Sequence, residues 1–270
     1  MEEHIRTPDP AASLVGIPEF LNPKHLSRAS LDSLRHALKG ISPAADPQRY
    51  AAAHLILGSA LRLHGQRVNG HEQAENYAEA IHAFEKAASV YCQAPPDGDD
   101  EDESVLVVNA RDGTVVQGDP IDIVLAATMS GAIEGVSMLH TAARALDARR
   151  MSIVRDSNLR DWATELSNFG CTLTLLGRRV DDADGIAHLE EAVDAFREVL
   201  QEPGLRELTH EYASVHVNLA DALQALGERA MPAERAQFLE RAVDALATAL
   251  SLVAPPNLRW MVEMQPAAFA

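Results

Sequence analysis

Three stretches of the chain superimpose without a gap and decide its fold class: YAAAHLILGSALRLHG at residues 50–65, WATELSNFGCTLTLLG at 162–177 and YASVHVNLADALQALG at 212–227. Each starts with an aromatic residue and has Gly or Ala eight residues on, at Gly58, Gly170 and Ala220. Each has glycine fifteen residues on, at Gly65, Gly177 and Gly227. A further apolar residue follows thirty-four residues after the start, in the frames AIHAF, AVDAF and AVDAL, at Phe84, Phe196 and Leu246. This agreement in all three copies indicates a repeated structural unit.

Each copy has the pattern of a helical hairpin. In the second copy, apolar residues recur at three- and four-residue steps before the loop, at Leu166, Phe169, Leu173 and Leu176. The same spacing recurs after the loop, at Leu189, Val193, Phe196 and Leu200. The glycine at the fifteenth step is expected to end the first helix in the left-handed conformation. One hairpin cannot bury such stripes alone, so neighbouring hairpins are expected to stack.

Composition supports an all-α fold. Apolar residues make up 47% of the chain but aromatic residues only 4%, and an Ala- and Leu-rich chain favours closely packed helices over sheets. The 40 acidic residues exceed the 23 basic ones and give a net charge of −17. Such a charge disfavours binding to nucleic acid or to a membrane surface. It suits a partner with a basic surface, although keeping the chain soluble is a simpler explanation.

The chain also has features expected of a cytoplasmic protein. Its first residues lack the charged and apolar regions of a signal peptide, and no run of eighteen apolar residues is long enough to span a bilayer. The two cysteines, Cys92 and Cys171, are too few for a disulfide framework. We therefore expect a reducing, cytoplasmic setting.

The spacing of the copies predicts an insertion in the middle of the chain. The second and third copies start fifty residues apart, but the first and second start 112 apart. The extra stretch contains the acidic tract DGDDEDE at 97–103 and SVLVVNARDGTVV at 104–116, whose valine-rich halves around a turn predict a β-hairpin. Leu146 lies one period before Phe196, so a degenerate unit is expected there, with Asp119-Pro120 opening its first helix.

These features divide the chain into seven parts. We expect an N-terminal extension with a capping helix near 30–39 at 1–45, a first unit at 46–92, an acidic linker with a β-hairpin or irregular insertion at 93–119, a degenerate unit at 120–155, further units at 156–203 and 206–254, and a C-terminal tail at 255–270. The tail begins where Pro255-Pro256 stop the last helix.

The motifs LSNFGCTL at 166–173 and AVDAF at 192–196 resemble those of the tetratricopeptide repeat (TPR) family. The resemblance covers 50–91 and 162–252 well and 120–150 weakly. It implies a right-handed superhelix of stacked antiparallel hairpins that binds a peptide or helix of a partner protein in a concave groove. A period near fifty residues is similar to the long bacterial variety found with CHAT-type proteases and in regulatory and defence proteins.

The resemblance also implies which side chains face the groove. They are Ser59 and Arg62 in the first copy, Ser167, Asn168, Cys171 and Thr174 in the second, and Asn218, Asp221 and Gln224 in the third. Asn168 and Asn218 share one repeat position, and an amide there can donate to and accept from a peptide backbone; alternatively, it ties adjacent hairpins together. Arg62 is the only cation of the set, so a carboxylate-clamp cochaperone is not expected.

No pattern in the sequence predicts catalysis, a metal site or a cofactor. The eleven histidines form no HExxH motif and the cysteines no CxxC motif. His54 and His216 occupy a core position of the repeat, which favours packed imidazoles. We expect a non-catalytic interaction scaffold or adaptor, or a regulatory subunit of an enzyme. Two alternatives stay open: an enzyme with its chemistry in 92–150, and a structural protein that self-assembles into homo-oligomers through its end hairpins.

Overall fold

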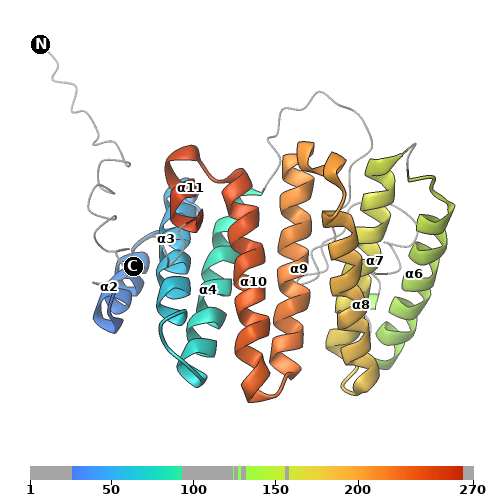
Figure 1. The fold of residues 1–270 in the computed structure, drawn as a ribbon, viewed down its shortest axis with the longest axis horizontal. Coiled ribbons are helices and arrows are strands. Elements are labelled where there is room, and N and C mark those ends of the chain that lie inside the picture. The colour runs from blue at the N-terminus through green and yellow to red at the C-terminus, as the bar shows by residue number, and fades with distance from the viewer. Residues whose placement is uncertain (1–25, 93–123, 125–126, 129–131, 156–157, 264–270) are drawn as a thin grey trace, which may run out of the picture.

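The computed structural model describes residues 26–92, 124, 127–128, 132–155 and 158–263. Every regular element in these residues is a helix, which confirms the all-α prediction for this part of the chain (Figure 1). The β-hairpin or irregular insertion expected at 93–119 lies outside the described residues, as do the acidic tract and Asp119-Pro120.

The three sequence copies form three antiparallel helical hairpins. In chain order the helices are α2 (Arg28–Leu38), α3 (Pro47–Gly65), α4 (His71–Tyr91), α6 (Ala132–Ser152), α7 (Leu159–Arg179), α8 (Ala183–Leu200), the 3-10 helix η2 (Pro203–Glu207), α9 (Thr209–Arg229), α10 (Pro232–Val253) and α11 (Pro256–Glu263). The hairpins are α3–α4, α7–α8 and α9–α10. Helix α6 packs against α7, where the second helix of the degenerate unit was expected, and α2 covers part of α3.

Side-chain caps define where several of these helices start. Asp46 accepts a hydrogen bond from the backbone N–H of Arg49 at the start of α3, with Pro47 as the first helical residue. Asn158 and Asp182 cap α7 and α8 in the same way. Because the first N–H groups of a helix have no partner within it, such caps stabilise each start by about 1 kcal/mol.

The small residue eight steps into each copy lets the two helices of a hairpin approach closely. A Cβ added at Gly58 would lie 2.4 Å from the ring of Phe84, and one at Gly170 would lie 2.8 Å from the ring of Phe196. Both rings are fully buried. The two sequence marks that stood twenty-six residues apart are thus one packing contact.

The glycines at the fifteenth step have a different role from the one predicted. They were expected to end the first helices with a positive φ, but Gly177 is helical and α7 continues to Arg179. Gly70 is the only described glycine with a positive φ. A Cβ at Gly177 would lie 2.4 Å from the side chain of Leu189 on α8. Helix α3 does end at Gly65, as expected, but the left-handed conformation was wrong, because close packing between helices rather than chain reversal requires glycine at Gly177.

The hairpins form one row, but their order in it is not their order in the chain. From one end the row is α2, α3, α4, α10, α9, α8, α7 and α6, so the first hairpin packs against the last (Figure 1). Helix α11 contacts both α10 and α3. The connection from α4 to α6 therefore joins elements at different places along the row.

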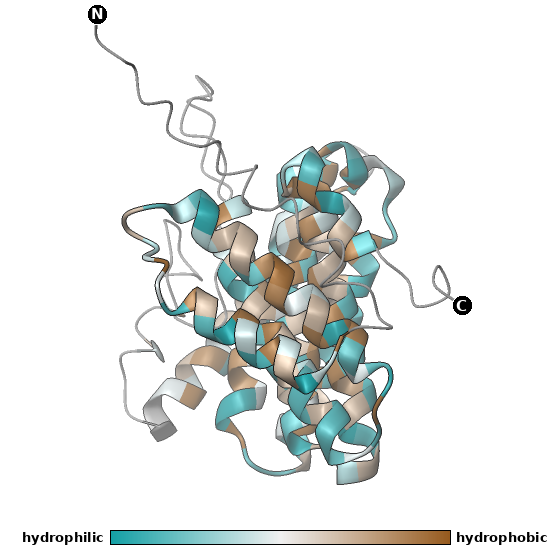
Figure 2. Cartoon of the chain, turned by 90° about the vertical axis from the view of Figure 1, so that its left-hand side faces the viewer, coloured by the Kyte–Doolittle hydropathy of each residue, from teal (hydrophilic) through white to brown (hydrophobic). Residues whose placement is uncertain are grey.

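Polar residues occur on all the helices seen from the α2 end of the row (Figure 2). Hydrophobic residues alternate with them around each helix, as expected for helices that bury one side only. No described helix is long and apolar enough to cross a membrane.

Candidate functional site

A small pocket opens between the N-terminal halves of α7 and α9. The end of α8, η2 and the start of α9 also line it, through Val199, Leu205 and Leu208. Its volume is about 40 Å³. The complete lining is Arg160, Ala163, Thr164, Ser167, Asn168, Val199, Leu205, Leu208, Glu211, Tyr212, Ser214, Val215 and Asn218. The interior is mainly apolar, with polar groups concentrated on α7 and α9.

Two asparagines face this pocket from equivalent positions of the repeat. Asn168 on α7 is 3% exposed and Asn218 on α9 is 5% exposed. Neither side-chain amide forms a hydrogen bond with any residue that the structure describes. Each amide keeps two donors and an acceptor. The amide atoms are not among the fully enclosed polar atoms, so a ligand in the pocket can reach them and supply hydrogen bonds.

An ion pair crosses the rim of the pocket. Arg160 on α7 donates to the carboxylate of Glu211 on α9 at 2.5 Å. Burial would raise the pKa of Glu211, but the hydrogen bond from Arg160 and a backbone hydrogen bond outweigh it and lower that pKa. Glu211 is therefore ionised at neutral pH, and the rim has one charge of each sign.

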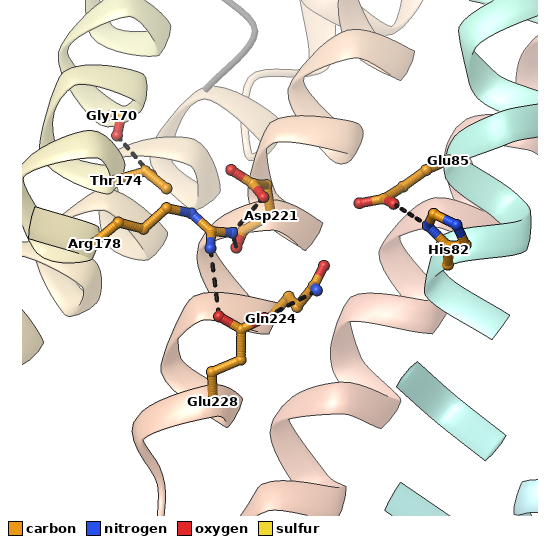
Figure 3. A network of polar contacts seen from close by, with 8 residues as sticks. All are labelled: His82, Glu85, Gly170, Thr174, Arg178, Asp221, Gln224 and Glu228. Carbon is orange, nitrogen blue, oxygen red and sulfur yellow. Dashed lines mark hydrogen bonds and ion pairs between the residues drawn. The ribbon is translucent and has the colours of Figure 1, made fainter. Parts of the chain in front are cut away.

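The C-terminal halves of α7 and α9 are joined by a second ionic contact (Figure 3). Arg178 donates to the carboxylate of Asp221 at 2.5 Å and to its backbone carbonyl at 3.2 Å. Glu228 lies 3.4 Å from Arg178 and accepts from the side chain of Gln224 at 3.1 Å. Asp221 and Gln224, predicted to face the groove, thus take part in contacts within the chain, and α7 and α9 are tied together at this end.

Three other predicted positions on α7 differ in access. Ser167 lines the pocket beside Asn168. Cys171 and Thr174 are 1% and 0% exposed, and the hydroxyl of Thr174 donates to the carbonyl of Gly170 at 2.9 Å. Burial raises the pKa of the Cys171 thiol above its usual value. A partner at the surface therefore does not reach Cys171 or Thr174, because α7 is surrounded on nearly all sides over this stretch.

The first-copy positions lie at a different contact altogether. Ser59 is 1% exposed and donates to the carbonyl of Leu55 at 2.9 Å. Arg62 is buried, lies 2.9 Å from Asp244 on α10 and donates to the carbonyl of Val262 on α11 at 2.9 Å. Arg62, expected to be a cation of the groove, thus takes part in contacts within the chain, because this side of α3 packs against the C-terminal helices.

The repeat histidines behave as packed imidazoles, as predicted. The ring of His54 contacts that of Tyr50 edge-on at 4.3 Å, and His216 contacts Tyr212 at 5.1 Å, between ring centroids. Burial lowers the pKa of each to about 4, with nearby Lys86 adding to the effect at His54. The described residues contain no group of three side chains that could hold a metal ion.

The pocket includes residues that the sequence did not single out. Leu205 and Leu208 belong to the short link between α8 and α9, which has no counterpart in the repeat pattern. Arg160 and Glu211 precede the stripe used to choose groove positions. An apolar pair in the otherwise polar loop QEPGLREL at 201–208 is the signal that could have pointed to the two leucines.

No protein-family model, no curated protein and no solved structure matches this chain. The resemblance to tetratricopeptide repeats stays a prediction.

Proposed function

We propose that this chain is a non-catalytic interaction protein that holds a segment of a partner protein at the pocket between α7 and α9. One observation carries the proposal: Asn168 and Asn218 place two nearly buried amides, without partners in the described chain, beside an apolar pocket. A polypeptide supplies both what the amides need, in its N–H and C=O groups, and an apolar side chain for the pocket.

The proposal extends to the whole row of helices. We propose that the row is a TPR-like solenoid and that the chain acts as an adaptor or regulatory subunit in the cytoplasm. The matched hairpins and the contacts of Gly58 and Gly170 with Phe84 and Phe196 support that relationship. The position of the first hairpin beside α10 is a departure from simple stacking in chain order. A partner engages the α7–α9 side in this proposal, while the first hairpin extends the row.

The pocket alone provides modest affinity. Burying one aliphatic side chain contributes about 1.5–3 kcal/mol, and each new hydrogen bond adds about 1 kcal/mol. Together these terms correspond to a dissociation constant on the order of millimolar. A partner held at cellular concentration must therefore make further contacts along α7 and α9.

Capture from native lysate followed by mass spectrometry tests the proposal. The bait proteins are the full chain, the Asn168→Ala/Asn218→Ala double variant, and Asn257→Ala as a control, since Asn257 is exposed on α11. We expect a protein that is retained by the wild type and the control but lost with the double variant. Equal retention by all three would remove the pocket from the function.

A further inference from the structure

The carboxylates on one side of α9 continue from the pocket toward the other end of the helix. Asn218, Asp221, Gln224 and Glu228 follow one another at three- and four-residue steps, so they share a side of the helix. Glu85 on α4 directs its carboxylate toward this side (Figure 3). We call Glu85, Asp221, Glu228 and Arg178 the acidic face. It has three carboxylates and one guanidinium, and Glu85 is also paired with His82 on α4 at 3.6 Å (Figure 3).

Glu228 is the accessible member of this acidic face. Its side chain is 47% exposed, whereas those of Asp221 and Glu85 are 11% and 18% exposed. Arg178 neutralises Asp221 at 2.5 Å but lies 3.4 Å from Glu228, which is long for a charged hydrogen bond. The Glu228 carboxylate can therefore accept a hydrogen bond from an incoming cation without displacing Arg178 from Asp221.

The size of the pocket limits the side chain that enters it. Its volume of about 40 Å³ is well below the ~150 Å³ of a cavity that takes a benzene ring. The branched end of a valine or leucine has that size, while an aromatic ring has at least six ring atoms. The lining by Ala163, Val199 and Leu205 suits an aliphatic group.

Helix geometry sets the distance between the two subsites. Val215 and Asn218 line the pocket, and Glu228 lies thirteen and ten residues beyond them. At about 1.5 Å per residue, the pocket and Glu228 are about 15–20 Å apart along α9. An extended peptide advances about 3.3 Å per residue and covers this distance in about four to six residues.

We propose that the bound segment is an extended peptide with an aliphatic side chain in the pocket and a lysine or arginine about four to six residues away, at Glu228. This inference rests on the proposed function and adds the chemistry of the ligand. The aliphatic group contributes apolar burial, the amides of Asn168 and Asn218 bind the peptide backbone, and the acidic face attracts the basic residue. The net charge of −17 favours approach of such a partner over an anionic one.

Selection from a phage-displayed library of random twelve-residue peptides tests this chemistry on the full chain. The wild type is compared with Asn168→Ala/Asn218→Ala, with Glu228→Lys, and with Glu190→Lys, which makes the same charge change at an exposed site on α8. We expect wild type and Glu190→Lys to enrich one pattern, an aliphatic residue and a basic residue at this spacing. The Glu228→Lys variant is expected to lose the preference for the basic residue.

A synthetic peptide with the enriched pattern then gives the magnitudes by fluorescence anisotropy. Replacing its basic residue with alanine is expected to weaken binding to the wild type by up to about fivefold, since the contact is half-exposed. The alanine-substituted peptide is expected to bind the Glu228→Lys variant at least as tightly as the original peptide binds that variant. Replacing its aliphatic residue with tryptophan is expected to weaken binding at least as strongly, because the pocket is too small for the ring.

The outcomes separate this inference from the proposed function. If nothing is enriched that depends on Asn168 and Asn218, the proposed function fails and the inference fails with it. If enrichment depends on the asparagines but selects aromatic or acidic residues, the function stands and the ligand chemistry is overturned. If the Glu228→Lys variant still selects peptides with a basic residue at this spacing, the proposed ligand chemistry is also overturned.

Discussion

The first hairpin and the later hairpins have the same internal packing but different outer surfaces. Gly58 contacts Phe84 as Gly170 contacts Phe196. Six residues into each copy, however, the first has Ile56, buried at 4% exposure, where the later copies have Asn168 and Asn218. Twelve residues in, Arg62 binds α10 and α11, whereas Gln224 donates to Glu228 on its own helix.

This comparison separates two kinds of information in the repeat. The small residue and the large residue that packs on it make a hairpin, and they are shared by the copies. The residue at the sixth step lines the pocket on α7 and α9, and the residue at the twelfth step of the first copy binds α10 and α11. Equivalent positions of the repeat therefore do not have to make equivalent contacts in the folded chain.

The largest expected effect tests the shared packing. Gly170→Leu and Gly58→Leu should each lower the free energy of unfolding by about 3 kcal/mol, because the new side chain meets a buried phenylalanine ring. Urea unfolding followed by circular dichroism measures the change. Gly40→Ala is the control, since its Cβ would meet only a backbone oxygen at 3.9 Å. An unchanged midpoint for Gly170→Leu would disprove the common packing.

The next effect concerns the docking of the first hairpin. Arg62→Ala should lower stability by about 1–3 kcal/mol, since it leaves the carbonyl of Val262 without its donor and removes the pair with the half-exposed Asp244. Gln224→Ala, at the same repeat position, should cost less than about 0.5 kcal/mol. Amide hydrogen exchange should rise in α3 and α4 more than in α7 and α8. Equal costs for the two variants would contradict the distinction.

Acid should destabilise the first and the last hairpin through their histidines. The pKa of His54 and of His216 is lowered from 6.5 to about 4 in the folded chain. The unfolded chain therefore takes up protons first, so stability present above pH 6.5 is lost as the pH falls toward 4. With partial solvent screening, each histidine should cost about 1–2 kcal/mol by pH 4.5.

Urea midpoints at pH 7 and pH 4.5 measure this loss. The second copy has Leu166 where the others have histidine, so His54→Leu and His216→Leu are matched replacements. Each should reduce the difference between the two pH values. A difference that both variants leave intact would assign the acid sensitivity to other groups.

The smallest expected change in stability concerns the residue at the sixth step, which is asparagine in the later copies and Ile56 in the first. Asn168→Ala and Asn218→Ala should change stability by less than about 0.5 kcal/mol, because the amides have no partner in the described chain. Ile56→Asn should instead cost about 1–3 kcal/mol or more, since it buries an amide in an apolar contact. Thermal unfolding compares the three variants. A large loss for Asn168→Ala would mean that this side chain supports the fold.

Local pattern predicted the helices well because the forces that make them are local. Apolar spacing and the caps at Asp46 and Asp182 act within a few residues. The pattern also placed Asn168 and Asn218 together, since equivalent positions of neighbouring hairpins lie side by side. It misassigned the glycines at the fifteenth step, because a glycine needed for close packing and one needed for a turn are the same letter in a sequence.

The sequence by itself determined the all-helical class, the three hairpins and the pairing of small with large residues inside them. Only the tertiary structure decided that the first hairpin packs on α10, through contacts such as Arg62 with Asp244, 182 residues apart. It alone brought Leu205 and Leu208 beside the asparagines to form the pocket. The physical reason is that hairpin packing follows a period along the chain, whereas the order of hairpins and the pocket depend on surfaces that meet only after folding.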